Sequence, residues 1–336
     1  MSRSIKILSA LLFITAFALQ GCQLEDETIE LPVIEDPGTG IWYVGKLTTA
    51  GDARFVRGYT INKTQYAFIA AGRNGFNIAN VTDGASPSLT ANYNTGGFVT
   101  EIYVDSVNGR HFAFLSDYEK GLLVLDVTTP QTPSLIDLVP YQNLTSVNRK
   151  NSILYSATAS GLKMLNINQL PDTLIDAGTY TPADYIKHIE VSGNLCCLVE
   201  NTAGLEFLNI TNPSSPVFNS TFKTPGSCLD IKIAGDLAYV ADGNSGISVI
   251  SVSNPAQPYF VRTVSTETDV RKLDYSPNFL FTAENNDGTS VFNLFDTSKP
   301  DFIGYYEPEG VTYAVHFYKA KILLANGANG LLILRF

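Results

Sequence analysis

A short apolar phrase recurs seven times along the chain, and each copy begins with a glycine. Two copies read Gly75-Phe-Asn-Ile-Ala-Asn-Val and Gly121-Leu-Leu-Val-Leu-Asp-Val. The phrase glycines, 40 to 46 residues apart, are Gly75, Gly121, Gly161, Gly204, Gly246, Gly288 and Gly330. Between the copies, apolar and polar residues alternate, and no segment has the period of a helix. Alternation with a period of two is typical of half-buried strands, so the pattern predicts an all-β protein with four short strands per repeat.

The unit around Gly246 shows how one repeat is expected to fold. Residues 229–233 alternate as a first strand, a tight turn follows at Gly235, and residues 237–241 form a second strand. The phrase at Gly246 is the third strand, and a proline corner leads to a fourth strand that starts at Tyr259. We expect the phrase glycine to adopt a positive φ in the preceding turn. Seven such units predict a seven-bladed β-propeller.

The last repeat lacks a fourth strand of its own. The seventh copy ends at Phe336, directly after its third strand. Residues 41–48 (Ile-Trp-Tyr-Val-Gly-Lys-Leu-Thr) resemble the fourth strands of the other repeats. We therefore expect this N-terminal strand to complete blade seven, so that the propeller spans residues 41–336 and leaves no open sheet edge where its two ends meet.

The repeat also resembles that of a known bacterial family. The phrase Leu-Leu-Val-Leu-Asp-Val after Gly121 is followed by a corner that contains Pro130 and Pro133, and this combination resembles the LVIVD repeat. The resemblance extends over residues 41–336. It implies a propeller on a secreted or surface-attached bacterial protein, and it assigns no biochemical role.

The chain begins with the features of a bacterial lipoprotein signal. Arg3 and Lys6 precede an uncharged apolar stretch, residues 7–19, which is too short to span a bilayer comfortably. The following Leu19-Gln-Gly-Cys22 resembles a lipobox. Residues 1–21 are therefore predicted to be a lipoprotein signal peptide, with Cys22 as the lipidated residue. An ordinary secretory signal with an incidental cysteine is the alternative.

Residues 22–40 are expected to form an acidic, flexible tether. The segment contains six acidic residues and no basic residue, and it has too little apolar surface to offset the entropy of ordering. Acidic residues directly behind a lipidated cysteine also resemble the surface-export signal of some bacterial lipoproteins. The predicted location is the bacterial cell envelope, with the protein attached to the outer membrane by its lipid and facing the cell surface.

Charge and motif content exclude several classes of function. The chain has 32 acidic and 22 basic residues, a formal net charge of −10, which argues against a nucleic-acid partner. It has three histidines, no zinc-binding spacing, no nucleophile elbow, no P-loop and no dinucleotide fingerprint. We therefore expect no cofactor and no dedicated metal site, although a divalent cation in the channel stays open. Cys196, Cys197 and Cys228 are expected to be buried thiols, with a disulfide between Cys228 and one of the pair as the alternative.

The innermost strand of each repeat should line the central channel. Alignment of the repeats places at equivalent positions near its mouth Gly58, Glu101, Ser146, His188, Asp230, Lys272 and Tyr313. The candidate ligand-binding residues are Arg57, Glu101, His188, Asp230, Arg271, Lys272 and Tyr313. A mixed ring of acids, bases, a histidine and a tyrosine at the surface of the mouth could orient a polar ligand. The alternative is that a channel mouth is polar in any propeller because it is wet.

Two functions from different classes are compatible with these observations. The first is a non-enzymatic surface lipoprotein whose propeller face binds a glycan, a peptide or a partner protein. The second is a propeller hydrolase or lyase that uses Glu101, Asp230 and His188 at the channel mouth. Binding is favoured because the sequence contains no catalytic motif. Convergence of the three side chains to within about 4–6 Å of one point, with shifted pKa values, would favour the enzyme.

Overall fold

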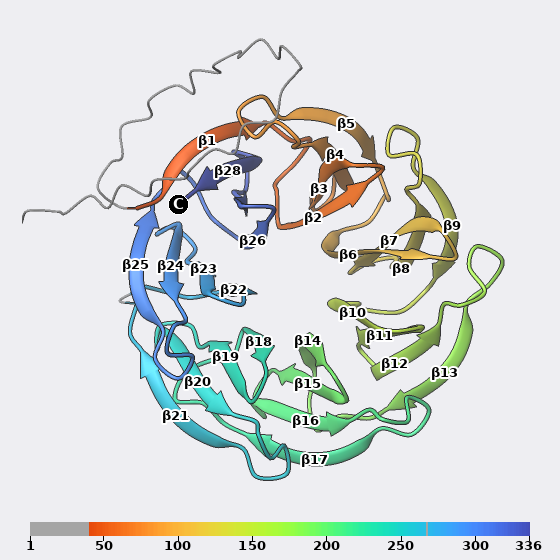
Figure 1. Cartoon of the computed structure of the whole chain (residues 1–336). Coiled ribbons are helices and arrows are strands. Elements are labelled where there is room, and N and C mark those ends of the chain that lie inside the picture. The colour runs from red at the N-terminus through yellow and green to blue at the C-terminus, as the bar shows by residue number, and fades with distance from the viewer. Residues whose placement is uncertain (1–39, 267) are drawn as a thin grey trace, which may run out of the picture. The chain divides into compact units, whose positions relative to one another are not determined.

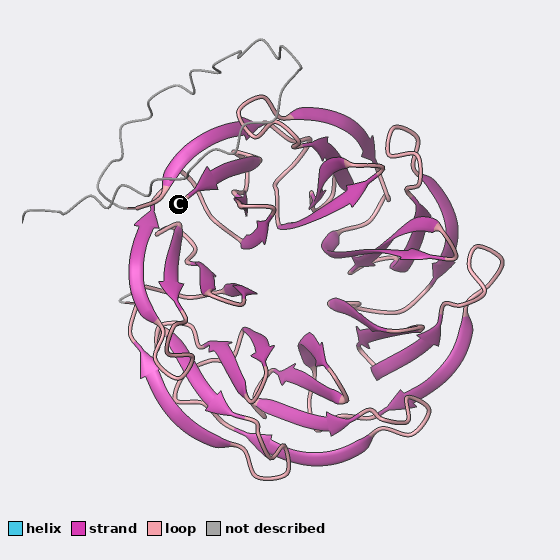
Figure 2. Ribbon diagram, viewed as in Figure 1, coloured by secondary structure: helices cyan, strands magenta, loops and turns pink. Residues whose placement is uncertain are grey.

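The computed structural model describes residues 40–266 and 268–336. In this part the chain forms 28 strands, which build seven four-stranded antiparallel sheets arranged in a ring (Figure 1, Figure 2). The prediction of an all-β, seven-bladed propeller is confirmed. The predicted signal peptide, the predicted lipidation site Cys22 and residues 23–39 of the predicted tether lie outside the described residues. No helix long and apolar enough to cross a membrane is found in the described part of the chain.

Six blades consist of four consecutive strands each, which follow one another from the channel outward. Blade one is β2 (Phe55–Ile61), β3 (Thr64–Ala70), β4 (Phe76–Asn80) and β5 (Ser88–Tyr93). Blade two is β6 (Val99–Val107), β7 (Arg110–Asp117), β8 (Gly121–Asp126) and β9 (Ser134–Val139). Blade three is β10 (Ser146–Lys150), β11 (Ile153–Thr158), β12 (Gly161–Asn166) and β13 (Ile175–Tyr180).

The chain continues around the ring in the same way. Blade four is β14 (Ile186–Ser192), β15 (Leu195–Glu200), β16 (Leu205–Asn209) and β17 (Val217–Phe222). Blade five is β18 (Asp230–Ala234), β19 (Leu237–Ala241), β20 (Ile247–Ser251) and β21 (Tyr259–Val264). Blade six is β22 (Lys272–Ser276), β23 (Phe279–Ala283), β24 (Thr289–Asn293) and β25 (Asp301–Tyr306).

Blade seven is closed by the N-terminal strand, as predicted. Its strands are β26 (Ala314–Tyr318), β27 (Lys321–Ala325), β28 (Leu331–Arg335) and, outermost, β1 (Trp42–Leu47). The antiparallel pairing of β1 with β28 runs from Trp42 opposite Arg335 to Leu47 opposite Leu331, and the two strands lie side by side in Figure 1. Ile41, directly ahead of β1, is completely buried in the core between blades six and seven. The first and last parts of the propeller are therefore joined by both hydrogen bonds and packing.

The hydrophobic core is divided among the contacts between neighbouring blades. Each of the seven apolar clusters combines residues of two adjacent blades. The cluster between blades three and four, for example, contains Tyr155 and Met164 from one blade and Ile189 and Leu198 from the other. Because strand side chains alternate between faces, a blade can present apolar residues to both neighbours while the edge of its innermost strand faces the channel.

The phrase glycine has the conformation that the sequence predicts. Gly246 has a φ of +77°, a region that residues with a Cβ rarely adopt. A Cβ at this position would also overlap the carbonyl oxygen of Val264 on the neighbouring outer strand. The glycine therefore allows the third strand to start close to the fourth. Its recurrence in every repeat is explained by this backbone requirement, and no functional role is needed to account for it.

Candidate functional site

Strand pairing identifies the residues that occupy equivalent places along the channel. Seven residues, one on each innermost strand, occupy equivalent places in the pairing with the second strand of their blade. This first row is Phe55, Glu101, Ser146, His188, Asp230, Lys272 and Ala314. Two positions further along the same strands lies the second row, Arg57, Tyr103, Asn148, Glu190, Lys232, Asp274 and His316. A cavity of about 310 Å³ is lined by every member of both rows except Ser146.

The structure brings together five of the seven candidate residues. Those that line the cavity are Arg57, Glu101, His188, Asp230 and Lys272. Arg271 and Tyr313 do not line it. The exposed Arg271 pairs with Asp269, with Nε 2.6 Å from Oδ2. The centre of the Tyr313 ring lies 4.3 Å from the guanidinium carbon of Arg54. These two residues directly precede the innermost strands of blades seven and one.

Two further details of the sequence alignment are wrong. In blade one the first-row position belongs to Phe55 instead of Gly58, and in blade seven it belongs to Ala314 instead of Tyr313. A position at the surface of the mouth was expected for the central candidates, but Glu101, His188 and Asp230 are only 7, 4 and 1% exposed. They are buried because they contact one another across the narrow channel.

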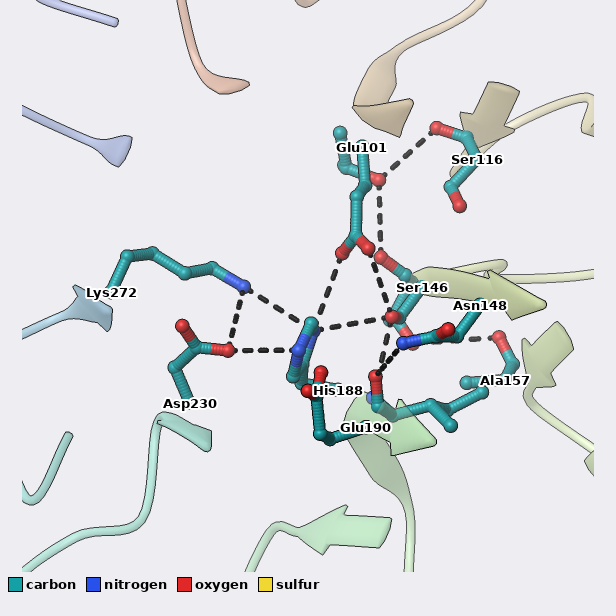
Figure 3. Close-up of polar contacts among 12 residues, drawn as sticks. Glu101, Ser116, Ser146, Asn148, Ala157, His188, Glu190, Asp230 and Lys272 are labelled. Atoms are coloured by element: carbon teal, nitrogen blue, oxygen red, sulfur yellow. Dashed lines mark hydrogen bonds and ion pairs between the residues drawn. The ribbon is translucent and has the colours of Figure 1, made fainter. Parts of the chain in front are cut away.

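His188 is the centre of this buried network (Figure 3). Its Nε2 lies 2.8 Å from Oδ1 of Asp230. Its Nδ1 lies 3.2 Å from the hydroxyl of Ser146 and 3.4 Å from Oε2 of Glu101. The ring N–H and the Asp230 oxygen are not aligned as a hydrogen bond, so their contact is an ion pair held by proximity and charge. The imidazole is therefore enclosed by two carboxylates and a hydroxyl.

Further contacts extend the network to five neighbouring blades. The ammonium of Lys272, from blade six, lies 3.5 Å from Oδ1 of Asp230 and 3.4 Å from Nδ1 of His188. The backbone N–H of Leu273 donates to the other Asp230 oxygen at 2.8 Å. The hydroxyl of Ser146 donates to Oε1 of Glu101 at 3.2 Å. The first row thus links blades two to six across the channel.

The charges in this network favour the ionised form of each acid and of the histidine. Burial alone would raise the pKa of Glu101, but His188 and Lys272 outweigh it and the pKa is lowered. The pKa of Asp230 is likewise lowered far below its usual range, against burial, by Lys272, His188 and Lys232. Burial and Lys272 oppose the charge of His188, yet the two carboxylates raise its pKa. The contacts therefore favour an imidazolium between two carboxylates.

The second row contains partly exposed charges that the sequence analysis missed, except for Arg57. Lys232 Nζ lies 3.4 Å from Oε2 of Glu190. His316 Nδ1 lies 3.1 Å from Oδ2 of Asp274, which also accepts a hydrogen bond from a backbone N–H. The period of two along each innermost strand was the signal that could have identified this row, since every second residue of such a strand faces the same side.

Other candidate chemistry is accounted for by the packing. Cys196, Cys197 and Cys228 are all free, buried thiols, so the alternative of a disulfide is wrong in this structure. Burial raises the pKa of each thiol. In the described ranges, no group of three or more His, Cys, Asp or Glu side chains is arranged to hold a metal ion.

The fold and the channel together define a class, a seven-bladed β-propeller with a charged, enclosed central channel. A model of the LVIVD repeat matches residues 63–95, 106–139, 185–224 and 225–266. The chain is therefore a propeller that contains LVIVD repeats, four of them identified by the family model, and the expected resemblance is confirmed. The matches fall in blades one, two, four and five.

The remaining comparisons concern the fold alone. No curated protein matches the chain. The crystal structure of the computationally designed Ika8 protein is similar, with a TM-score of 0.62 and 9% sequence identity. The similarity covers 88% of this chain and 99% of that chain. Since 1401 solved chains match, the likeness reflects a widespread fold and assigns no function.

Proposed function

We propose that this protein is a lipid-anchored component of the bacterial cell envelope, facing the cell surface, whose propeller channel binds the polar part of a glycan, a peptide or a partner protein. The observation that carries the binding proposal is the cavity of about 310 Å³, lined by two rows of mostly charged and polar side chains. Ligand pockets typically begin at about 300 Å³ and use a few fixed polar groups for orientation.

The groups that line the cavity are held in place before any ligand arrives. The Lys232–Glu190 ion pair and the contact of His316 with Asp274 fix the partly exposed second row. Beneath them the His188 network gives the cavity a rigid, buried floor. A preorganised site loses less side-chain entropy on binding, which favours affinity for a polar ligand.

Blocking the cavity tests whether the channel is the binding site. Asn148, a half-buried second-row residue, lines the cavity, and Asn148→Tyr should fill part of it. Asn219→Tyr places the same side chain on the outer strand β17 and is the matched control. Glycan and peptide arrays probed with both variants should show binding lost only for Asn148→Tyr. Equal binding by the two variants would contradict a site in the channel.

The hydrolase or lyase alternative has one observation in its favour, the convergence of His188, Asp230 and Glu101. With Ser146 as a neighbour of His188, the arrangement also resembles a Ser-His-Asp triad. However, Ser146 is completely buried and its hydroxyl already donates to Glu101, so a substrate cannot reach it. The raised pKa of His188 favours the imidazolium, which has no lone pair for a general base.

Turnover measurements separate the alternative from the binding function. We expect no product from chromogenic glycosides and esters with either the wild-type chain or His188→Gln. Turnover that is present in the wild type and absent in His188→Gln would favour the enzyme. Glutamine is polar and similar in length to histidine, so His188→Gln should still fold. A melting curve of this variant separates a loss of activity from unfolding.

The anchoring part of the proposal rests on the lipobox-like Leu19-Gln-Gly-Cys22. Cys22→Ser should move the protein from the detergent phase to the aqueous phase, because no thiol remains for the lipid. Cys228→Ser is the control, since that cysteine lies 5% exposed in the propeller core and should leave partitioning unchanged. Detergent partitioning of a processed Cys22→Ser protein would contradict lipidation at this residue.

A further inference from the structure

The charged side chains that line the cavity are paired, with one exception. Each of the other cationic or potentially cationic groups has a carboxylate within 4 Å: His188 and Lys272 with Asp230, Lys232 with Glu190, His316 with Asp274, and Arg149 with Asp105. The four lining acids, Glu101, Glu190, Asp230 and Asp274, all have such a partner. Among the described residues, Arg57 has neither an ion pair nor a side-chain hydrogen bond.

Arg57 is held in the cavity by an aromatic ring instead. Its guanidinium carbon lies 4.4 Å from the ring centre of Tyr103, the second-row residue of the next blade. This contact with the ring uses none of the acceptors that a guanidinium N–H needs, so the N–H groups of Arg57 stay available to another partner. The half-buried Arg57 therefore presents unsatisfied, charged donors to the cavity.

A guanidinium whose N–H groups have no partner is suited to one kind of ligand group. Arginine's fork of N–H groups matches the two oxygens of a carboxylate and binds them side by side. Each of the four lining carboxylates already has a cationic partner, so the charge of a ligand is left to Arg57. A single negative charge matches the single unpaired cation, so a carboxylate satisfies both the geometry and the charge of the site.

We propose that the channel ligand carries a carboxylate and that Arg57, held over the ring of Tyr103, binds it. This inference rests on the proposed binding function of the channel. Arg57 is in blade one, across the channel from blades four and five, where the Glu190–Lys232 pair lies (Figure 1). The carboxylate end therefore contacts Arg57, and the hydroxyl or amide groups of the ligand contact the opposite pair. A sugar acid and a peptide C-terminus share this chemistry.

Calorimetric titration of the full chain carrying Cys22→Ser tests the proposal with defined probes. Glucuronate and galacturonate represent sugar acids, and an acetylated dipeptide with a free C-terminus represents peptides. Glucose, galactose and the dipeptide amide are their uncharged counterparts. At least one acid should bind, and its uncharged counterpart should bind at least tenfold more weakly. Binding of a sugar acid would identify the ligand as a glycan, and binding of the dipeptide would identify it as a peptide C-terminus.

Variants at Arg57 show whether the selectivity comes from this side chain. Arg57→Met should weaken binding of the acid by about 10- to 100-fold, the usual range for hydrogen bonds to a charged group. Arg57→Lys should retain part of the affinity, since it keeps the charge and loses the paired geometry. Arg73→Met is the matched control, because Arg73 is exposed, pairs with Glu119 and lies outside the cavity. Melting curves confirm that each variant is folded.

The possible failures are distinguishable. If none of the acids binds, or if Arg57→Met binds them as tightly as Arg73→Met does, the carboxylate inference is overturned. If an uncharged sugar or amide binds and Asn148→Tyr abolishes that binding, the inference fails while the channel remains the binding site. If every probe that binds does so equally well to Asn148→Tyr, both the inference and the proposed site fail.

Discussion

Replacing Ile41 with alanine should destabilise the whole ring, although the residue precedes the first strand. Ile41 is completely buried in the cluster between blades six and seven, which includes Phe281, Val315 and Leu334. Truncation of a buried isoleucine to alanine costs about 2–5 kcal/mol, because apolar contacts are lost and a cavity remains. Relative to the total stability of about 5–15 kcal/mol for a typical domain, this is a large fraction.

Thermal unfolding of Ile41→Ala and Tyr43→Ala, measured side by side, tests this reasoning. Tyr43 lies on β1 itself but is 42% exposed. At about 2 °C per kcal/mol for a domain of this size, Ile41→Ala should lower the Tm by about 4–10 °C. Tyr43→Ala should shift it by about 2 °C or less, as exposed substitutions usually do. Equal shifts would mean that the N-terminal segment contributes no specific packing to closure, and size-exclusion chromatography would then show whether the ring opens.

Three other changes have defined expected outcomes. Asp230→Ala should lower the free energy of unfolding measured in urea by about 3–5 kcal/mol, because His188 and Lys272 would lose their shared partner, and the buried His188 would have to keep an uncompensated charge or give up its proton; a neutral effect would contradict the ionised network. Glu200, whose pKa is raised to about 7 by burial and by the neighbouring Glu206, holds its proton more tightly when folded, so stability should fall as the pH rises from about 4.5 to 7. In Glu200→Gln the fall in Tm over this range should be smaller, and an unchanged slope would show that Glu200 does not titrate there. Gly45→Val should prevent closure, seen as aggregation in size-exclusion chromatography, since a Cβ at Gly45 would overlap the carbonyl oxygen of Gly84; a monomeric variant with unchanged Tm would refute this.

The repeat pattern was sufficient to predict the architecture because it reflects the backbone directly. Phrase glycines such as Gly246 mark a turn with positive φ, and alternation marks strands whose two faces pack against neighbouring blades. The closing strand could be predicted from a count of strands, since the last copy ends at Phe336 without its fourth strand. None of these steps required knowledge of contacts between distant side chains.

The channel could be predicted only in part, because its details depend on register and on contacts across the ring. In blade one the loop before β2 differs from the other loops, and the alignment reached Gly58 where the structure has Phe55. The burial of His188 and Asp230 could not be derived from their own strands, since each is covered by side chains of other blades. The missing partner of Arg57 is visible only when the partners of all its neighbours are known.

Closure by β1 also decides how the protein bears tension. The chain enters the ring at Ile41 and continues into β1, so a force applied to the residues ahead of Gly40 reaches the propeller first through this segment. A pull along this strand loads all five residue pairs between β1 and β28 together, whereas a pull across it opens them one at a time, beginning with Trp42 and Arg335. The direction of pulling, relative to blade seven, therefore sets the force at which the ring opens. The six other blades are each made from one continuous stretch of chain, and they would bear load only after blade seven has lost its outer strand.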